Sequence, residues 1–262
     1  MKIIDCSACI GEDSVNRLIV NHENYPVIER VKQPKNAAEL LAEMDFNGID
    51  EAVTYHADMM SSGVFGGNEL FLRQKENYTG RLHGTIVMLP SFYGDEFLPE
   101  NLLATVRRHD LFGVRANPRQ NRYMFDRITV ADTADMLAER GIPVYISPMD
   151  GWDLLFSVLK EFPSLTVIIT NYGLWGSDGY IYPLVKSYPN VYLDTSDLQE
   201  IVGIEAFVRR FGSERLLFGT NYPMDNMGGP LAALFGAKIG QAERENIAFR
   251  NFERLNAGRK LK

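Results

Sequence analysis

Histidine and cysteine, the residues that most often build metal and redox sites, are scarce in this sequence. Its 262 residues include four histidines and two cysteines. The cysteines, Cys6 and Cys9, form a C-x-x-C pair at the end of a strand-like run rather than at a helix start. Their odd spacing places the side chains on opposite faces of a strand, and no other cysteine is present to complete a zinc cluster. We therefore expect neither a redox pair nor a structural zinc site there.

The sequence also lacks the features of membrane and nucleic-acid-binding proteins. Its formal net charge is −7, which disfavours binding to nucleic acid or to an anionic membrane surface. No apolar run approaches the roughly 20 residues of a membrane span, and the opening run MKIID is not a signal peptide. Nucleotide-binding glycine motifs and the G-x-S-x-G elbow are absent. We expect a cytoplasmic protein with no nucleic-acid or membrane partner.

What the sequence does contain is an alternation of apolar strand-like runs and amphipathic helical stretches. Strands are predicted at residues 3–7, 51–56, 83–89, 113–117, 143–147, 166–171, 191–195 and 216–221. Helices are predicted at residues 37–46, 68–78, 102–109, 130–140, 152–162, 181–187, 199–211 and 241–256. Such strands pair in parallel, and eight strand–helix units close into a barrel of about 250 residues. The prediction is an α/β fold, a single (β/α)₈ TIM barrel over residues 1–262, since no linker or short repeat interrupts it.

Two loops follow the first and second predicted strands. Residues 11–33 form a connection that is long for this type of fold, and such loops are usually functional lids or disordered. Residues 61–67, SSGVFGG, are rich in glycine and predict a second, flexible loop. Both lie on the side where the strands end, which is the side that carries the active site in barrel enzymes.

Several strand ends carry recognisable motifs. They are Ile4-Asp5-Cys6-Ser7-Ala8-Cys9, Pro143-Val144-Tyr145-Ile146-Ser147-Pro148, Val167-Ile168-Ile169-Thr170-Asn171-Tyr172-Gly173 and Phe218-Gly219-Thr220-Asn221-Tyr222-Pro223. In this order they resemble the strand ends of the amidohydrolase-related family of metal-dependent barrel hydrolases and decarboxylases. The last motif is the most specific, because it is similar to that family's Gly-[Ser/Thr]-Asp-Tyr-Pro. The segment 247–255, with Asn251, resembles the family's closing helix, so the resemblance implies an amidohydrolase-like barrel.

The resemblance also implies where the family's metal ligands would stand. Its metal histidines correspond to Ser7, Cys9, Ser147 and Asn171, and its aspartate corresponds to Asn221. Hydroxyl and amide oxygens bind catalytic divalent ions weakly, and one thiol does not restore the set. We therefore expect no catalytic metal and no other cofactor, and a hydrogen-bonding pocket for a small-molecule ligand. The alternative is a metal held by unexpected ligands such as Asp5, Cys9 and His56.

Histidine is the natural general base near neutral pH, and two histidines border predicted strands. His56 ends the second strand, where it either reaches the barrel mouth as a catalytic residue or serves a structural role. His83 begins the third strand and is expected to face the opposite end of the barrel. Cys9 becomes a candidate nucleophile if His56 lies beside it.

Charged residues also end predicted strands. Arg115 ends the fourth, where it either binds a substrate carboxylate or phosphate through its guanidinium fork or forms an internal ion pair with Asp5 or Asp194. Asp194 ends the seventh, where it either transfers protons or caps a helix.

Two functional hypotheses follow. The first is a metal-independent hydrolase or lyase, with decarboxylation as one possibility, that acts on a small carboxylate or lactone. Its catalytic residues would be His56, Arg115 and Asp194. Its substrate-binding residues would be Ser7, Cys9, Asn117, Tyr145, Ser147, Asn171 and Asn221. The second is a catalytically inactive barrel that binds a ligand or a partner chain. A homo-oligomer is a further expectation, with apolar Val64, Phe65 and Phe97 as interface candidates.

Overall fold

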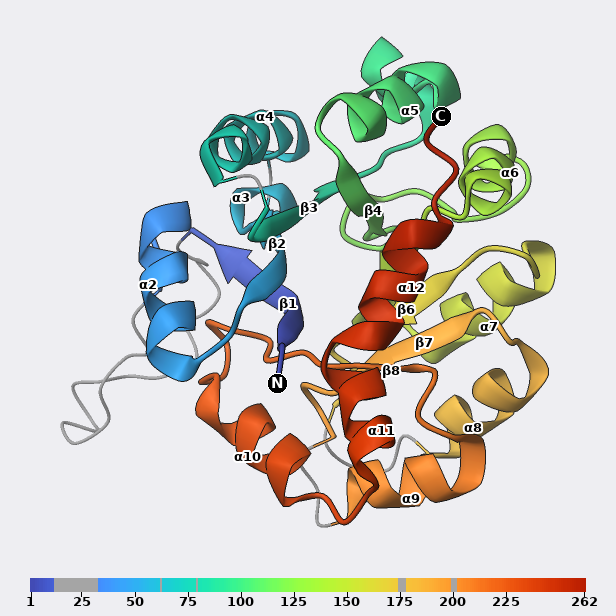
Figure 1. The fold of residues 1–262 in the computed structure, drawn as a ribbon. Helices are drawn as coiled ribbons and strands as arrows, with labels where there is room; N and C mark the ends of the chain where they lie inside the picture. The colour runs from blue at the N-terminus through green and yellow to red at the C-terminus, as the bar shows by residue number, and fades with distance from the viewer. Residues whose placement is uncertain (12–32, 62, 79, 174–177, 199–201) are drawn as a thin grey trace, which may run out of the picture.

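Eight parallel strands, arranged in the order of the sequence, form the centre of the computed structural model (Figure 1). The structure describes residues 1–11, 33–61, 63–78, 80–173, 178–198 and 202–262. The strands are β1 (Ile4–Ile10), β2 (Glu51–His56), β3 (Leu82–Val87), β4 (Leu111–Ala116), β5 (Val144–Ile146), β6 (Val167–Ile169), β7 (Val191–Asp194) and β8 (Leu216–Leu217). Each strand pairs with the next in parallel, which confirms the predicted α/β class and TIM barrel.

The barrel closes between β1 and the segment that follows β8. The Cys6 N–H donates to the Phe218 carbonyl at 2.7 Å, and the Cys9 N–H donates to the Tyr222 carbonyl at 2.8 Å. These bonds satisfy backbone groups that would otherwise lie unpaired at two sheet edges. Closure therefore places the end of β1 directly beside the motif that follows β8.

A buried carboxylate reinforces this closure. Asp5 Oδ1 accepts hydrogen bonds from the N–H of Ser7 at 2.9 Å and of Thr220 at 3.0 Å. Asp5 Oδ2 accepts from the Thr220 hydroxyl at 2.5 Å. Burial raises the pKa of Asp5 to about 6, although these three hydrogen bonds oppose the shift. Asp5 thus has a structural explanation, as the group that joins the first strand to the last.

Helices surround the barrel on its outer side (Figure 1). They are α2 (Ala37–Asn47), α3 (Asp58–Ser61), α4 (Val64–Lys75), α5 (Pro99–Arg108), α6 (Ala131–Arg140), α7 (Trp152–Glu161), α8 (Asp178–Ser187), α9 (Gly203–Phe211), α10 (Gly228–Gly236), α11 (Gln241–Glu245) and α12 (Asn251–Gly258), with a π-helical turn at Asn246–Arg250. Helix α2 begins where the Asn36 side chain accepts from the Glu39 N–H and ends at Gly48, whose φ of 72° suits glycine. None of the described helices has the length and apolarity that a membrane crossing requires.

The barrel interior is filled by side chains from most of the strands and from α12. These are Ile4, Cys6, Val53, Phe112, Tyr145, Ile168, Leu217 and Phe252. Phe252 enters from α12, which crosses the barrel in Figure 1, and its ring lies 4.7 Å from that of Phe112. A larger apolar cluster lies between the strands and the outer helices. The interior is therefore a packed core at this end of the barrel.

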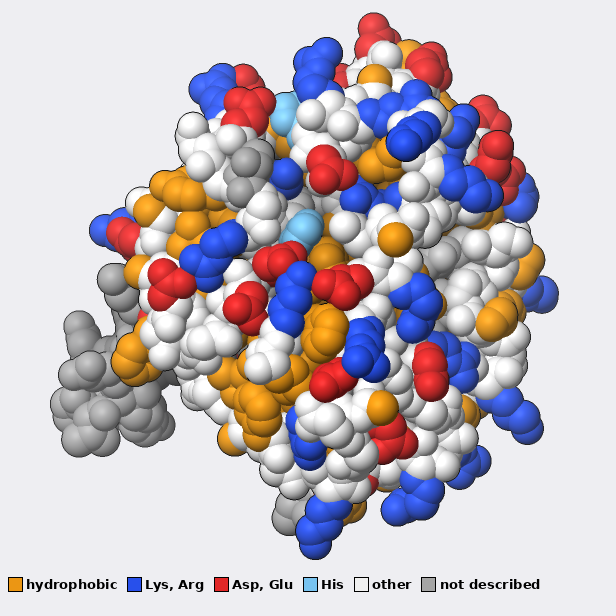
Figure 2. Space-filling view, in the orientation of Figure 1, with side chains coloured by type: hydrophobic (Ala, Val, Ile, Leu, Met, Phe, Trp, Pro, Cys, Tyr) orange, Lys and Arg blue, Asp and Glu red, His pale blue; other side chains and the backbone are white. Residues whose placement is uncertain are grey.

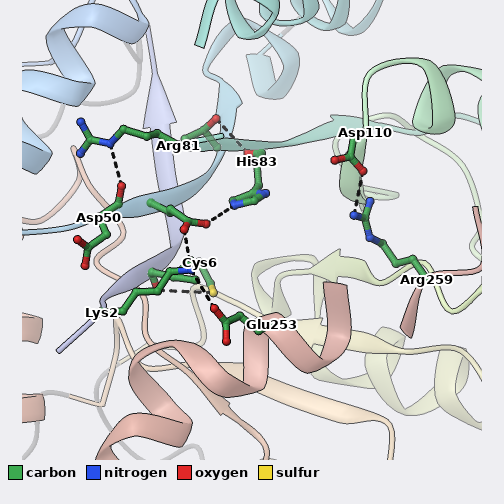
Figure 3. Close-up of polar contacts among 11 residues, drawn as sticks. Lys2, Cys6, Asp50, Arg81, His83, Asp110, Glu253 and Arg259 are labelled. Atoms are coloured by element: carbon green, nitrogen blue, oxygen red, sulfur yellow. Dashed lines mark hydrogen bonds and ion pairs between the residues drawn. The ribbon is translucent and has the colours of Figure 1, made fainter. Parts of the chain in front are cut away.

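Charged residues cover the end of the barrel that α12 crosses. The Lys2 ammonium lies 2.7 Å from Glu51 and 2.8 Å from Glu253, and His83 Nε2 lies 2.7 Å from Glu51. Figure 3 shows Lys2, His83 and Glu253 meeting here, and Figure 2 shows basic and acidic side chains interspersed over the same face. His83 therefore faces the end opposite the barrel mouth, as expected.

Helix α4 replaces most of the flexible loop predicted at residues 61–67, and that prediction is wrong. Residues 64–67 form its first turn, and the Gly67 N–H donates to the Gly63 carbonyl at 2.6 Å. A Cβ on Gly67 would lie 2.5 Å from the Met59 backbone nitrogen. Glycine is needed here for close packing rather than for flexibility. The long loop predicted at 11–33 falls, apart from its two end residues, outside the described part of the chain.

A β-bulge overturns the prediction that Cys6 and Cys9 lie on opposite faces of the first strand. The register between β1 and β2 shifts between Asp5 and Ala8, which breaks the alternation of side chains. Cys6 lies in the barrel interior and Cys9 lines the cavity at the barrel mouth, so both point inward.

Of the three apolar residues proposed for a subunit interface, Val64 and Phe97 are buried within the chain. Phe65 is 47% exposed, and its ring lies 5.3 Å from the Phe97 ring in an edge-on arrangement. Self-association stays a prediction.

Asn251 offers a direct test of how the last strand is held. Its Nδ2 donates to the carbonyls of Ser213 and Leu216, each at 2.7 Å, and the side chain is fully buried. Asn251→Ala leaves both carbonyls buried without this donor, so we expect the free energy of unfolding to fall by roughly 2–4 kcal/mol in urea titrations. The exposed Asn77 donates to one carbonyl at 3.5 Å, so Asn77→Ala should change it by less than about 0.5 kcal/mol. Equal effects would contradict the assigned role.

Candidate active site

A cavity of about 540 Å³ opens at the carboxyl ends of the strands. It is lined by Cys9, Tyr55, Ala57, Met60, Gln120, Pro148, Met149, Trp152, Asn171, Tyr172, Gly173, Asp197, Asn221 and Met224. The volume, the apolar majority and the few polar side chains suit a small organic molecule. The cavity lies on the side where barrel enzymes carry their chemistry.

The ends of β6 and β8 bring two of the predicted substrate-binding residues into the cavity wall. Asn171 and Asn221 both have left-handed backbone conformations, with φ of 53° and 56°, a region that asparagine tolerates better than most residues. Asn171 Oδ1 is buried, and no residue in the described part of the chain hydrogen-bonds it. Asn221 Nδ2 donates to Asp225 Oδ2 at 3.3 Å. Cys9, a third predicted residue, lines the cavity beside them.

Two other predicted residues support the lining from behind. Ser147 Oγ accepts from the Met149 N–H at 3.2 Å and donates to the Asn171 carbonyl at 3.4 Å. Asn117 Nδ2 lies 3.2 Å from Met60 Sδ. Ser147 and Asn117 thus position cavity residues but do not themselves line the cavity.

Ser7 and Tyr145 lie deeper, in the layer of side chains beneath the cavity. A Cβ on Gly219 would lie 3.2 Å from the Ser7 Cβ, so Ser7 packs against the segment that follows β8. The Tyr145 hydroxyl donates to the Cys6 carbonyl at 3.1 Å, and burial raises the pKa of Tyr145 well above its ordinary value. Both are part of the barrel interior rather than of the cavity surface.

Arg115 is the most unusual group in this deeper layer. The side chain is 3% exposed, and its Nε donates to Thr85 Oγ1 at 3.0 Å. The guanidinium carbon lies 3.8 Å from the centre of the Tyr55 ring and 4.6 Å from that of Tyr145. Nη2 is buried and has no hydrogen-bond partner among the described residues. Because Tyr55 also lines the cavity, the guanidinium lies directly behind the cavity wall.

The alternative of an internal ion pair for Arg115 does not hold. Within the described part of the chain, no carboxylate lies within ion-pair distance of Arg115; Asp5 instead bonds Thr220, and Asp194 bonds Ser196. The positive charge is therefore balanced by two aromatic faces and one hydroxyl. This leaves donor capacity that an anion would use.

His56 lies away from the cavity. Tyr55 points into the barrel, and the next residue along the strand points outward, so the His56 ring packs against Gly11. A Cβ on Gly11 would lie 2.6 Å from the ring. His56 Nδ1 accepts from the Asp58 N–H at 3.2 Å, and burial lowers the pKa of His56. A role for His56 in proton transfer stays a prediction, but the structure does not bring it together with Cys9, Asn171 or Asn221.

Asp194 is fully buried in the deeper layer and does not line the cavity. Its Oδ1 accepts from the Ser196 N–H at 3.0 Å and from the Ser196 hydroxyl. Burial raises the pKa of Asp194 to about 6, opposed by the hydrogen bonds from Ser196. The local geometry is that of a carboxylate that shapes the turn after β7.

Sequence reasoning missed Asp197, three residues further along. It lines the cavity, is 8% exposed, and accepts a hydrogen bond from the Gly173 N–H at 3.0 Å through Oδ2. Burial raises the pKa of Asp197, and the negative charge of Asp225 adds to the shift. The run Asp194-Thr195-Ser196-Asp197 contains two carboxylates, and attention to the turn as well as the strand end would have found the second.

A metal would find few ligands here. In the described residues, no group of three or more histidine, cysteine, aspartate or glutamate side chains is arranged to hold an ion. The lining instead offers amides, one thiol and one carboxylate. This donor set suits hydrogen bonding rather than the coordination of a catalytic divalent ion.

Asp194 gives the stability of the protein a predictable pH dependence. Its pKa is higher in the folded state than the ordinary 3.8, so the folded protein binds more protons between about pH 4 and 6, and stability falls as pH rises through that window. Asp194→Asn keeps the acceptor for Ser196 and removes this ionisation. We expect the unfolding free energy of Asp194→Asn to fall less steeply with rising pH than that of wild type. The two slopes should differ by roughly 1 kcal/mol per pH unit over this window. Urea titrations at pH 4.5, 5.2 and 6 test this, and parallel curves for the two proteins would contradict it.

Comparison with known proteins identifies a matching protein family. A family model described as amidohydrolase matches residues 22–255. A search of curated proteins finds no match. An uncharacterised TIM-barrel protein from Bordetella bronchiseptica superposes with a TM-score of 0.74 at 21% identity, covering 98% of this chain and 99% of that one.

Two decarboxylases are similar in fold. The 5-carboxyvanillate decarboxylase of Sphingomonas paucimobilis has a TM-score of 0.65 at 15% identity, covering 98% of this chain and 99% of that one. A dihydroxybenzoic acid decarboxylase from Polaromonas, solved with bound manganese and the inhibitor 2-nitroresorcinol, has a TM-score of 0.75 at 14% identity, covering 98% and 97%. At these identities the similarity concerns the fold.

Proposed function

Because the chain belongs to the amidohydrolase family, we propose that it is a hydrolase or lyase that acts on a small carboxylate or lactone without a catalytic metal. One observation carries the proposal: the buried guanidinium of Arg115 has no carboxylate partner in the described chain and lies behind the wall of a cavity of about 540 Å³. A substrate carboxylate would supply the missing partner.

The energetics of Arg115 favour this role. A buried charge costs several kcal/mol unless it is paired, and the two aromatic rings and the Thr85 hydroxyl offset part of that cost. An aromatic face contributes about 2 kcal/mol to a desolvated cation, and Nη2 still lacks an acceptor. A carboxylate can accept two parallel hydrogen bonds from a guanidinium. We expect the Tyr55 ring to shift when the anion binds, because that ring separates the guanidinium from the cavity.

Metal independence rests on the chemistry of the donors. One of the structurally similar decarboxylases holds manganese. The motif resemblance assigns the family's ligand positions to Ser7, Cys9, Ser147, Asn171 and Asn221 in this chain. These residues do not fit a catalytic divalent ion. In the proposed reaction, the Asn171 and Asn221 amides instead orient the substrate by hydrogen bonding from the cavity wall.

The second candidate function is a catalytically inactive barrel that binds a ligand or a partner chain. It is favoured by the placement of His56 and Asp194, neither of which lines the cavity. Without a group that transfers protons at the cavity surface, the same pocket would bind but not convert its ligand.

Variants of Arg115 test whether this residue binds the carboxylate group of a ligand. We expect Arg115→Ala to weaken binding of small carboxylates at least 10-fold, and Arg115→Lys to weaken it less, because the charge stays but the fork is lost. Binding is measured by calorimetry and by the rise in melting temperature, and turnover is measured with a panel of lactones and carboxylates. Arg108→Ala, on the exposed face of α5, is the matched control. Carboxylate affinity that is unchanged in Arg115→Ala would overturn the proposed anion site.

Metal content gives a separate test. Purified protein should contain well under one equivalent of manganese, zinc, iron or cobalt, and incubation with a chelator should leave both turnover and melting temperature unchanged. Elemental analysis and chelator titration measure these quantities. A stoichiometric transition metal whose removal abolishes turnover would refute metal independence.

A further inference from the structure

One carboxylate lies in the cavity wall itself. Among the described residues that line the cavity, Asp197 is the sole carboxylate, and none of the others is histidine, lysine or arginine. The remaining lining side chains with an ionisable group are the thiol of Cys9 and the phenols of Tyr55 and Tyr172, whereas the usual general bases are carboxylates and imidazoles. A reaction in this cavity that needs a base therefore has one suitable group.

The backbone after β6 holds this carboxylate in place. Asp197 Oδ2 accepts from the Gly173 N–H at 3.0 Å, and the Tyr172 N–H also hydrogen-bonds the carboxylate. The Tyr172 hydroxyl donates to the Asp194 carbonyl at 2.8 Å, which fixes the turn that carries Asp197. These hydrogen bonds hold Tyr172, Gly173 and Asp197 together as one part of the cavity wall.

The charged groups near Asp197 are negative. Asp225 approaches from the segment after β8, and Asp194 lies on the same turn. Tyr172 and Tyr55 line the same cavity. Burial and the neighbouring Asp225 carboxylate raise the pKa of Asp197, so its ionised form is more basic than an ordinary aspartate.

We infer that Asp197 is the general base of the reaction at this cavity and activates water for attack on a lactone carbonyl. This inference rests on the proposed function. The Asp197 carboxylate takes a proton from water while the water oxygen bonds to the carbonyl carbon. The ring carbon–oxygen bond then breaks, and the proton passes from Asp197 to the departing alkoxide. The product is a hydroxy acid, which loses its carboxyl proton to solvent at neutral pH.

Asn221 cannot act as the general base, although by the motif resemblance it corresponds to the family's aspartate. An amide does not accept a proton from water near neutral pH, and Asn221 Nδ2 already donates to Asp225. Asp197 lies in the same cavity wall and supplies the carboxylate that position 221 lacks. In this chain the carboxylate that acts as the base therefore lies in the turn after the seventh strand, at Asp197, rather than at the end of the eighth strand.

Kinetics of Asp197 variants on a lactone panel test the inference. We expect Asp197→Asn to lower kcat roughly 100-fold or more while leaving the Kd for a non-hydrolysable carboxylate within about threefold of wild type. Asp197→Glu should recover part of the rate. Asp132→Asn, which changes an exposed carboxylate on α6, should match wild type.

The pH profile provides a second readout. In wild type, kcat/KM should rise with pH through a limb set by Asp197, because the ionised form is active. Asp225→Asn removes a neighbouring negative charge and should move this limb to lower pH. In Asp197→Asn the limb should disappear.

The outcomes separate this inference from the function on which it rests. If wild type hydrolyses a lactone and Arg115→Ala weakens its binding, but Asp197→Asn retains full kcat and the same limb, Asp197 is not the base and the proposed function stands. If wild type turns over carboxylates but no lactone, the inference about Asp197 is overturned and the proposed function stands. If it binds carboxylates but turns over no lactone or carboxylate in the panel, both are overturned in favour of a binding barrel. Melting temperatures of all variants within about 3 °C of wild type show that lost rate is not lost fold.

Discussion

The hydrogen bonds that join β1 to the segment after β8 are the constraint on which this molecule depends. The Cys6 and Cys9 N–H groups donate across the seam, and Asp5 binds both the N–H and the hydroxyl of Thr220. A barrel has no free edges only if its first and last strands meet. Here the seam does more than close the sheet, because it brings Cys9 and Asn221 into one cavity wall.

Beneath that cavity lies a layer of polar groups in an otherwise apolar barrel. Arg115 and Asp194 are both buried in it, yet the structure keeps them unpaired with one another. Asp194 Oδ1 is bonded by its own turn, although its Oδ2 is buried without a partner among the described residues, whereas Arg115 relies on two aromatic faces and a hydroxyl. An arginine arranged in this way is costly for stability alone, and this cost is the reason that we connect it with recognition of an anion.

The sequence predicted the architecture well, because the alternation of strands and helices is a repeated signal. The prediction failed where one local feature interrupts the regular pattern of side chains along an element. The bulge in β1 turned Cys6 and Cys9 to the same side, and close packing of Gly67 on Met59 turned a glycine-rich stretch into a helix. Helix α10 was missed because it opens with Gly228-Gly229-Pro230, which resembles a turn.

For the candidate site, the sequence predicted the right end of the barrel but only some of its residues. Cys9 lies near the end of β1, and Asn171 and Asn221 lie in the segments after β6 and β8, so all three line the cavity. His56 does not, since a strand directs successive side chains to opposite faces and Tyr55 takes the inward position. Asp197 could not be placed from strand patterns, because a turn positions it through backbone contacts with a neighbouring segment.

The most direct test of the account is a crystal structure of the protein with a bound small carboxylate, with anomalous diffraction data collected at transition-metal absorption edges. The account predicts a carboxylate oxygen within hydrogen-bond distance of Arg115 Nη2 and no anomalous peak in the cavity. An anomalous peak from an ion coordinated between Cys9, Asn171 and Asn221, with the carboxylate bound to that ion and Arg115 still without an anion, would contradict it.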